Sequence, residues 1–175
     1  MTLPPLTLVL GGARSGKSAH AETLVESHAS SGLYVATARI DDAEMEIRAA
    51  AHRERRGPFW TTAEAPLDPG AALADAAPGR PALVDCLTLW LNNLMAEGYD
   101  VETASEDLFA ALAAAPGPVV LVANEVGLGI VPDNALARAF RDHAGRLNQA
   151  VAARADRVDF VAAGLVMPLK RGEAG

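Results

Sequence analysis

The stretch GGARSGKS, residues 11–18, constrains the fold of this chain more than any other segment. It follows the apolar run LTLVL at 6–10 and precedes a segment with helical spacing at 17–30. A glycine, four residues and then Gly-Lys-Ser, set between a strand and a helix, is the pattern of a phosphate-binding loop. The glycines let backbone N–H groups turn inward around an anion, and the helix N-terminus adds its positive dipole end. The sequence therefore predicts a site for nucleoside triphosphates.

Within such a loop the side chains have distinct roles. Lys17 is expected to reach the β and γ phosphates, and the Ser18 hydroxyl is expected to ligate Mg²⁺. The site also needs a carboxylate at the end of a neighbouring strand, to hold the water shell of the metal. Asp85, which closes the apolar run ALVD, is the candidate, and its alternative role is to cap a helix expected at 87–97. We favour the metal role because the preceding residues have the pattern of a buried strand.

The order of apolar and helix-like segments predicts the fold class. Short, continuously apolar runs at 6–10, 33–38, 82–87, 118–123 and 157–163 are typical of strands that are covered on both faces. Helix-like stretches occur at 17–30, 42–56, 87–97, 103–115 and 133–155, the last beginning at Pro132 and Asp133. This alternation predicts an α/β fold: one domain over 1–175, with a mostly parallel sheet and helices on both faces. Ligands bind such sheets beyond the carboxyl ends of the strands.

Charge and composition exclude some classes of function. The chain has 15 Lys and Arg against 22 Asp and Glu, a net charge of −7, which argues against a motor on nucleic acid or adsorption to an anionic membrane. We find no signal peptide and no apolar run of about 20 residues, so no membrane span is expected. The single cysteine, Cys86, cannot form an internal disulfide, which favours the cytoplasm.

A basic segment, AAAHRERRGPFW at 49–60, places His52 among arginines. On a helix over 42–56, His52 would lie on the same side as Arg48, Arg55 and Arg56. One interpretation is a solvated helix face. The other is a nucleophile, because neighbouring guanidinium groups would keep the imidazole neutral and hold phosphate oxygens. Direct transfer of a γ-phosphoryl group needs no such histidine, so the second interpretation indicates a second reaction.

Several segments together resemble the bifunctional adenosylcobinamide kinase / adenosylcobinamide-phosphate guanylyltransferase family. They are GGARSGKS, YVATA, HRERRGPFWTTAE, NEVGLGIVP and LARAFRDHAGRLNQAVA, and the likeness extends to GLVMPLK. The pair NEVGLGIVP and FRDHAGRLNQ is the most specific. The resemblance implies a RecA-like P-loop NTPase fold and a homotrimer. It implies an enzyme that phosphorylates the aminopropanol hydroxyl of adenosylcobinamide and then transfers GMP from GTP to that phosphate through a guanylylated histidine. Its substrates would be GTP (and ATP) and the corrinoid, with Mg²⁺.

The resemblance also assigns residues. His52 and Lys17 would be catalytic, and Ser18 and Asp85 would bind the metal. The nucleotide-binding residues would be Gly11, Gly12, Ala13, Arg14, Ser15, Gly16, Lys17, Ser18, Ala36, Thr37, Ala38, Arg53, Glu54, Arg55, Arg56, Glu64 and Asp85. The chain departs from the family at Ala38, where many members carry a polar residue, and at Asp85, where some carry Glu.

Other polar residues leave alternatives open. Glu125 could act as a base or contact substrate, or it could cap the loop that Gly127 and Gly129 shape. His143 is interpreted as a structural or interface residue, and His20 is expected at the surface. Two rival functions also remain at this point: a single-activity P-loop kinase of another small alcohol, and a nucleotide-dependent switch. The sequence does not distinguish ATP from GTP as the phosphoryl donor.

Overall fold

A computed structural model describes residues 2–39 and 57–171, and in this part of the chain the strands form one seven-stranded sheet. The expected helix at 42–56 lies outside the described residues. The strand order is β3-β2-β4-β5-β1-β6-β7. All pairs are parallel except β6 with β7, which is antiparallel. The bounds are β1 Leu6–Gly11, β2 Gly32–Ala36, β3 Trp60–Glu64, β4 Ala82–Asp85, β5 Val119–Asn124, β6 Arg157–Ala162 and β7 Leu165–Lys170.

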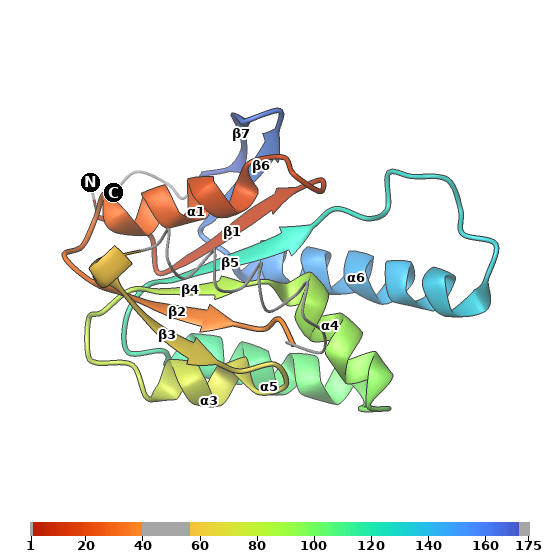
Figure 1. Ribbon diagram of the computed structural model, residues 1–175, viewed down its shortest axis with the longest axis horizontal. Coiled ribbons are helices and arrows are strands. Elements are labelled where there is room, and N and C mark those ends of the chain that lie inside the picture. Colours follow the sequence, from red (N-terminus) through yellow and green to blue (C-terminus); the bar gives the residue numbers. More distant parts are fainter. Residues whose placement is uncertain (1, 40–56, 172–175) are drawn as a thin grey trace.

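Helices cover both faces of this sheet, as the alternation of segments predicted. Figure 1 shows α1 on one face and α3 to α6 on the other. Their bounds are α1 Lys17–Glu26, α3 Pro69–Ala74, α4 Leu87–Ala96, α5 Val101–Ala114 and α6 Ala135–Arg154, with a 3₁₀ turn η1 at Gly57–Phe59. The predicted α/β class is therefore confirmed. None of the helices in the described ranges is both long and apolar enough to cross a bilayer.

The two faces of the central strands pack into separate apolar clusters. Val9 and Val122 pack with residues of α1, whereas Leu8 and Leu121 pack with α4, α5 and α6. Successive side chains of a strand point to opposite faces, so a strand that is buried on both must be apolar throughout. Fully burying each such side chain contributes about 1.5–3 kcal/mol. This burial explains why the central strands were recognisable as continuous apolar runs.

The strands β3 and β7 and the short helix α3 were not predicted, although residues 165–169 of β7 form an apolar run. The strands β3 and β7 lie at the two edges of the sheet. In β3 only Trp60 is buried, and every residue of β7 is exposed. The short α3 begins with Pro69 at its first turn and is capped by Asp68, whose carboxylate accepts a hydrogen bond from the Ala71 amide. That Asp-Pro pair is a helix-start signal that could have been used.

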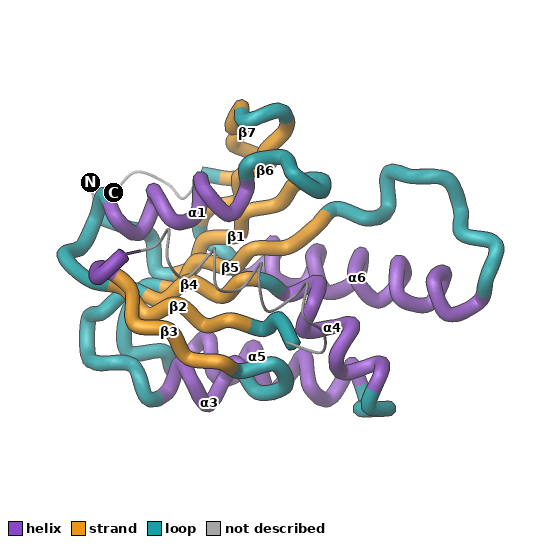
Figure 2. Tube along the Cα trace, in the orientation of Figure 1, coloured by secondary structure: helices purple, strands orange, loops and turns teal. Residues whose placement is uncertain are grey.

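The start of α6 also differs from the prediction. The helix begins at Ala135, and Asn134 rather than Asp133 caps it, because the Asn134 side chain accepts a hydrogen bond from the Ala137 amide at 2.7 Å. Residues 125–134, between the end of β5 and the start of α6, form a long loop, drawn in teal in Figure 2. This loop leaves the carboxyl edge of the sheet, where the predicted site residues lie.

Candidate functional site

The loop at 11–18 joins β1 to α1 and is closed by backbone contacts. The Ser15 amide donates to the Gly12 carbonyl at 3.3 Å, and the Lys17 ammonium donates to the same oxygen at 3.3 Å. From outside the loop, the Gly164 amide of the β6–β7 turn donates to the Ser15 carbonyl at 2.8 Å. The loop is therefore anchored by the hairpin that follows β6.

Two glycines of this loop are required by geometry. A Cβ atom on Gly11 would collide with the Val161 carbonyl and would lie 2.6 Å from the Ser15 hydroxyl oxygen. Gly16 has a φ of 98°, a conformation that side chains disfavour. The glycines that define the motif thus allow the strand, the loop and α1 to approach one another closely.

The predicted acidic residues meet in one row of the sheet. Ala36 at the end of β2 pairs with Glu64 of β3 on one side and with Asp85 of β4 on the other. Tyr34 and Leu83 lie two residues before Ala36 and Asp85, and both pack in the cluster that contains α1. Because side chains alternate, the row faces the same side as α1, which begins at the phosphate loop.

Asp85 does not cap α4, so the alternative role is wrong. The capping position of α4 is Cys86, and no side chain makes a capping hydrogen bond there. Instead, the Asp85 carboxylate accepts a hydrogen bond from the Tyr34 hydroxyl at 2.8 Å. Its strand is also not adjacent to β1, because β5 lies between them. Asp85 therefore faces the α1 side of the sheet. It lies two strands away from β1, whereas the sequence predicted an acidic residue on the strand next to it.

Thr37 has a structural role that the sequence did not reveal. It is fully buried, and its hydroxyl donates to the Cys86 carbonyl and accepts from the Cys86 amide, both at 2.7 Å. The Thr37 carbonyl in turn accepts a hydrogen bond from the Asn93 side chain at 2.8 Å. The hydroxyl of this predicted nucleotide-binding residue thus holds the junction of β4 and α4, directly after Asp85. Ala38, the next predicted contact, is partly exposed.

Cys86 at this junction is not a nucleophile. Burial, and to a smaller extent the negative charge of Asp85, raise the pKa of its thiol to about 11, although the Lys17 charge acts in the opposite direction. The thiol therefore stays protonated near neutral pH.

The basic segment that raised the possibility of a second reaction belongs to the part of the chain that the structure does not describe. His52, Arg53, Glu54, Arg55 and Arg56 lie outside the described residues. Their assigned roles remain predictions. The described chain on either side of them ends at Arg39 and resumes at Gly57. Arg39 forms an ion pair with Glu97, which follows the last residue of α4, with 2.6 Å between nitrogen and oxygen.

A buried ion pair beside the loop was missed. The His20 ring of α1 lies 2.7 Å from the carboxylate of Asp159 in β6, and the Arg157 guanidinium lies 2.7 Å from the same oxygen. Burial alone would raise the pKa of Asp159, but hydrogen bonds from His20 and Arg157 outweigh it and lower the pKa below its usual value. The expectation that His20 is a simple surface residue is therefore wrong. An aspartate within the apolar run RVDFVAA was the available signal.

Glu125 takes the capping role that the sequence left open. Its carboxylate accepts a hydrogen bond from the Gly127 amide, which shapes the start of the long loop after β5. The same side chain borders a cavity of about 360 Å³ together with the phosphate loop, Leu128 and Phe160. Glu125 is thus fixed at one oxygen and close to the phosphate loop.

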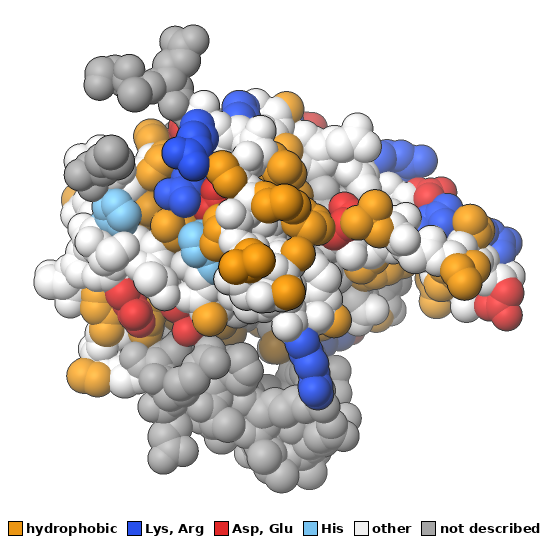
Figure 3. Space-filling model, turned by 90° about the horizontal axis from the view of Figure 1, so that it is seen from above, with side chains coloured by type: hydrophobic (Ala, Val, Ile, Leu, Met, Phe, Trp, Pro, Cys, Tyr) orange, Lys and Arg blue, Asp and Glu red, His pale blue; other side chains and the backbone are white. Residues whose placement is uncertain are grey.

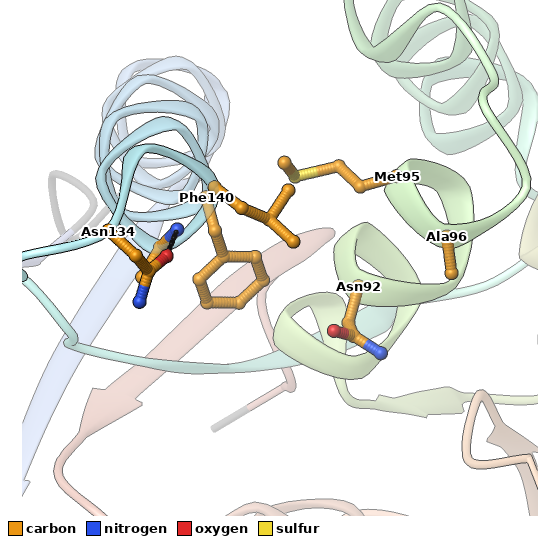
Figure 4. Close-up of a pocket in the computed structure, with 7 residues that line it drawn as sticks. Asn92, Met95, Ala96, Asn134 and Phe140 are labelled. Atoms are coloured by element: carbon orange, nitrogen blue, oxygen red, sulfur yellow. Dashed lines mark hydrogen bonds between the residues drawn. The ribbon is translucent and has the colours of Figure 1, made fainter.

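His143 connects two helices of the opposite face. Its ring nitrogen lies 3.5 Å from the carboxylate of Glu102 in α5. Figure 4 shows a second feature of this side, a pocket of about 420 Å³ between α4 and α6. Asn92, Met95 and Phe140 point into it, and none of its lining residues belongs to the phosphate loop.

Apolar side chains are also exposed on the β6–β7 hairpin and on the loop after β5. Leu165, Met167 and Leu169 of β7 are exposed by half or more, and Ile130 is almost fully exposed. Figure 3, which views the molecule from above, shows hydrophobic side chains gathered on this face. Clustered exposed apolar groups of this kind mark contact surfaces.

Several solved structures share this fold, and some of them are described as ATPases. The flagellar accessory protein FlaH of Methanocaldococcus jannaschii matches with a TM-score of 0.52 and 12% identity, over 98% of this chain and 80% of that chain. An ATPase of a bacterial type III secretion system matches with a TM-score of 0.54 and 11% identity, over 93% of this chain and 56% of that chain. These matches establish a RecA-like P-loop fold and carry no information on substrate.

Two curated proteins have a much higher sequence identity to this chain than these structures have. The bifunctional adenosylcobalamin biosynthesis protein CobP of Pseudomonas aeruginosa is 49% identical over 166 residues, which cover 93% of this chain and 96% of that protein. The protein of the same description named CobU, from Salmonella typhimurium, is 45% identical over 182 residues, covering 94% and 99%. The family model described as cobinamide kinase / cobinamide phosphate guanyltransferase matches residues 7–169, and the chain therefore belongs to that family.

Proposed function

We propose that this chain phosphorylates adenosylcobinamide and then transfers GMP from GTP to adenosylcobinamide phosphate, giving adenosylcobinamide-GDP. The description of the family names both activities, and the relatives are called bifunctional, so both comparisons support the two activities. The structural observation that carries the proposal is the phosphate loop at the tip of β1, with Asp85 on the face of the sheet that α1 covers.

In the kinase step the aminopropanol hydroxyl attacks the γ-phosphorus of the nucleotide. The new oxygen–phosphorus bond forms as the bond to the β–γ bridging oxygen breaks, and the nucleoside diphosphate leaves. Backbone N–H groups of the loop and the Lys17 ammonium neutralise charge on the phosphates, which is the main contribution of a protein to this reaction. In this structure the Lys17 ammonium donates to the Gly12 carbonyl. Its side chain would turn from there toward the phosphates when nucleotide binds.

The residues present fit a magnesium ion. Ser18 lies in the first turn of α1 and Asp85 lies on the sheet face that α1 covers, so both would supply the oxygen ligands that Mg²⁺ prefers. In residues 2–39 and 57–171 no three His, Cys, Asp or Glu side chains form a metal cluster. This agrees with an ion held mainly by phosphates and water. When bound, Mg²⁺ withdraws charge from the phosphate oxygens.

In the second step His52 is the proposed nucleophile, on the strength of the family resemblance. Its imidazole nitrogen bonds to the α-phosphorus of GTP as the bond to pyrophosphate breaks. The phosphate of adenosylcobinamide phosphate then attacks the same phosphorus and releases the histidine. Arg55 and Arg56 would hold the charged oxygens during both displacements.

The proposal extends to assembly and location. A homotrimer is inferred from the resemblance, and the exposed apolar residues of β7 and of the loop after β5 offer surfaces that contacts between copies would cover. A cytoplasmic location agrees with the single cysteine, which is unpaired and buried. Residues 1–175 are proposed to work as one domain.

Labelling with GTP tests the two-step function. Protein incubated with Mg²⁺ and GTP labelled at the α-phosphate should retain label that is lost in acid and kept in alkali, as a phosphoramidate is. Label at the γ-phosphate should not be retained, because it leaves with pyrophosphate. His52→Ala should abolish labelling while phosphorylation of cobinamide continues, since that step needs no protein nucleophile.

The arginine variants provide the matched comparison. Arg55→Ala or Arg56→Ala should slow labelling without eliminating it, as expected of groups that stabilise charge and form no bond. Wild-type protein that takes no label, or His52→Ala protein that takes as much, would leave a single-activity kinase as the better description.

A further inference from the structure

Asn124 ends β5, at a position between the phosphate loop and Asp85. The strand β5 lies between β1 and β4, and Asn124 pairs in register with Gly11, where the loop begins. Val120 and Val122 of the same strand pack in the cluster that contains α1. Because side chains alternate along a strand, Asn124 projects on the α1 side as well. The end of β5, beside the end of β1, can be followed in Figure 1.

The backbone of Asn124 is fixed, whereas its side chain has an unused acceptor. The Asn124 amide donates to the Thr88 hydroxyl at 2.7 Å, and its carbonyl accepts from the Asn148 side chain at 3.2 Å. The next residue is tied too, since the Glu125 amide donates to the Gly11 carbonyl at 3.1 Å. The side-chain oxygen of Asn124 is buried and has no hydrogen-bond partner among residues 2–39 and 57–171.

A buried carbonyl without a partner is costly and rare, so it indicates a group that is satisfied when ligand is present. An asparagine side chain offers a donor and an acceptor and carries no charge. Terminal phosphates are anionic, so a carboxylate at this place would repel them, whereas an amide can donate to them. The neutral Asn124, nearer the loop than the charged Asp85, fits contact with the transferring phosphoryl group.

We propose that the Asn124 side chain orients the phosphoryl acceptor against the terminal phosphate. This inference rests on the proposed function, whose kinase step it deepens. The amide N–H donates to a γ-phosphate oxygen, and the buried carbonyl oxygen accepts from the attacking hydroxyl. The hydroxyl oxygen bonds to the γ-phosphorus, the bond to the β–γ bridging oxygen breaks, and the hydroxyl proton passes to a phosphoryl oxygen. Asn124 makes no contact with the α-phosphorus chemistry of the second step.

The full-length chain with Asn124→Ala, Asn124→Asp and the control Asn148→Ala provides the test. Asn148→Ala removes the hydrogen bond to the Asn124 backbone but no group that faces the loop. Calorimetry measures the affinity for a non-hydrolysable nucleoside triphosphate and for the diphosphate. Asn124→Ala should weaken triphosphate binding about tenfold, because one hydrogen bond to a charged group is lost. Asn124→Asp should weaken it more, because its carboxylate also repels the terminal phosphate. Diphosphate binding should stay within about twofold in both Asn124 variants and in the control.

A second measurement separates a role in the site from a structural one. At saturating GTP, Asn124→Ala should lose at least about tenfold in cobinamide phosphorylation while labelling of the protein from α-labelled GTP continues. Equal losses of triphosphate and diphosphate affinity, or parallel losses of phosphorylation and labelling, would overturn the inference. If wild-type protein did not phosphorylate cobinamide while its triphosphate preference depended on Asn124, the proposed function would fail and the phosphate contact would stand.

Discussion

Replacing Thr37 by valine removes one hydroxyl from the junction between β4 and α4 and nearly preserves its volume. In the native protein this hydroxyl bridges the Cys86 amide and carbonyl, with 2.7 Å to each. The Cys86 carbonyl also accepts a hydrogen bond from the Trp90 amide at 3.1 Å, so it keeps one partner in the variant. The Cys86 amide donates to the Thr37 hydroxyl, and none of these other hydrogen bonds would replace that partner in the variant.

The cost follows from these partners. Leaving the buried Cys86 amide unsatisfied costs about 1–3 kcal/mol, and the carbonyl loses one of two hydrogen bonds, about 0.5–1.5 kcal/mol. The free energy of unfolding should therefore fall by about 2–4 kcal/mol. For a chain of 175 residues this corresponds to a decrease in Tm of about 5–15 °C. Thr37→Ser keeps the hydroxyl and loses only a methyl group, so it should cost about 1 kcal/mol.

Urea unfolding followed by circular dichroism measures both variants, and calorimetry with a nucleoside triphosphate measures binding. We expect Thr37→Val to lose much more stability than Thr37→Ser, and we expect Thr37→Ser to bind nucleotide as the wild type does. The opposite pattern, a valine variant that unfolds within about 0.5 kcal/mol of wild type and binds nucleotide weakly, would refute it. The hydroxyl would then contact the nucleotide; the family resemblance implied only that Thr37 belongs to a nucleotide-contacting stretch.

Three further variants test the surroundings of the site. Lys17→Ala should abolish both cobinamide phosphorylation and labelling from GTP, because both would use one phosphate loop, and normal labelling would contradict a shared site. Asp85→Asn should shift the Mg²⁺ dependence of turnover without changing the urea midpoint, since the amide oxygen can still accept from Tyr34; an unchanged titration would exclude the metal role. The lowered pKa of Asp159 means that its carboxylate stabilises the native state above the unfolded pKa and that this stability is lost as pH falls. The stability difference between wild type and Asp159→Asn should thus be constant above about pH 5 and shrink toward about pH 3, and urea unfolding across this range that shows no change would contradict the ion pair.

The sequence alone determined the parts of this protein that depend on local geometry or continuous burial. The loop at 11–18 is recognisable because neighbouring residues make it: Gly11 must allow close approach, Gly16 must adopt a positive φ, and α1 follows directly. The central strands are recognisable because burial on both faces demands apolar residues throughout. From the loop and the order of apolar runs along the chain, Asp85 could be predicted at the carboxyl edge of the sheet, where the structure has it at the end of β4; its role in metal binding stays a prediction.

Only the tertiary structure decided which strands are neighbours and which polar groups meet. The edge strands β3 and β7 form by pairing with β2 and β6 and leave one side open, so the apolar residues 165–169 of β7 stay exposed, and the sequence does not show whether such a run is a buried strand. The partners Thr37 and Cys86 are 49 residues apart, and His20 and Asp159 are 139 apart. Asn124 reaches the site only because β5 inserts between β1 and β4. Such contacts bring together residues distant in the chain, and no local propensity specifies them, because packing of the whole sheet sets the strand order.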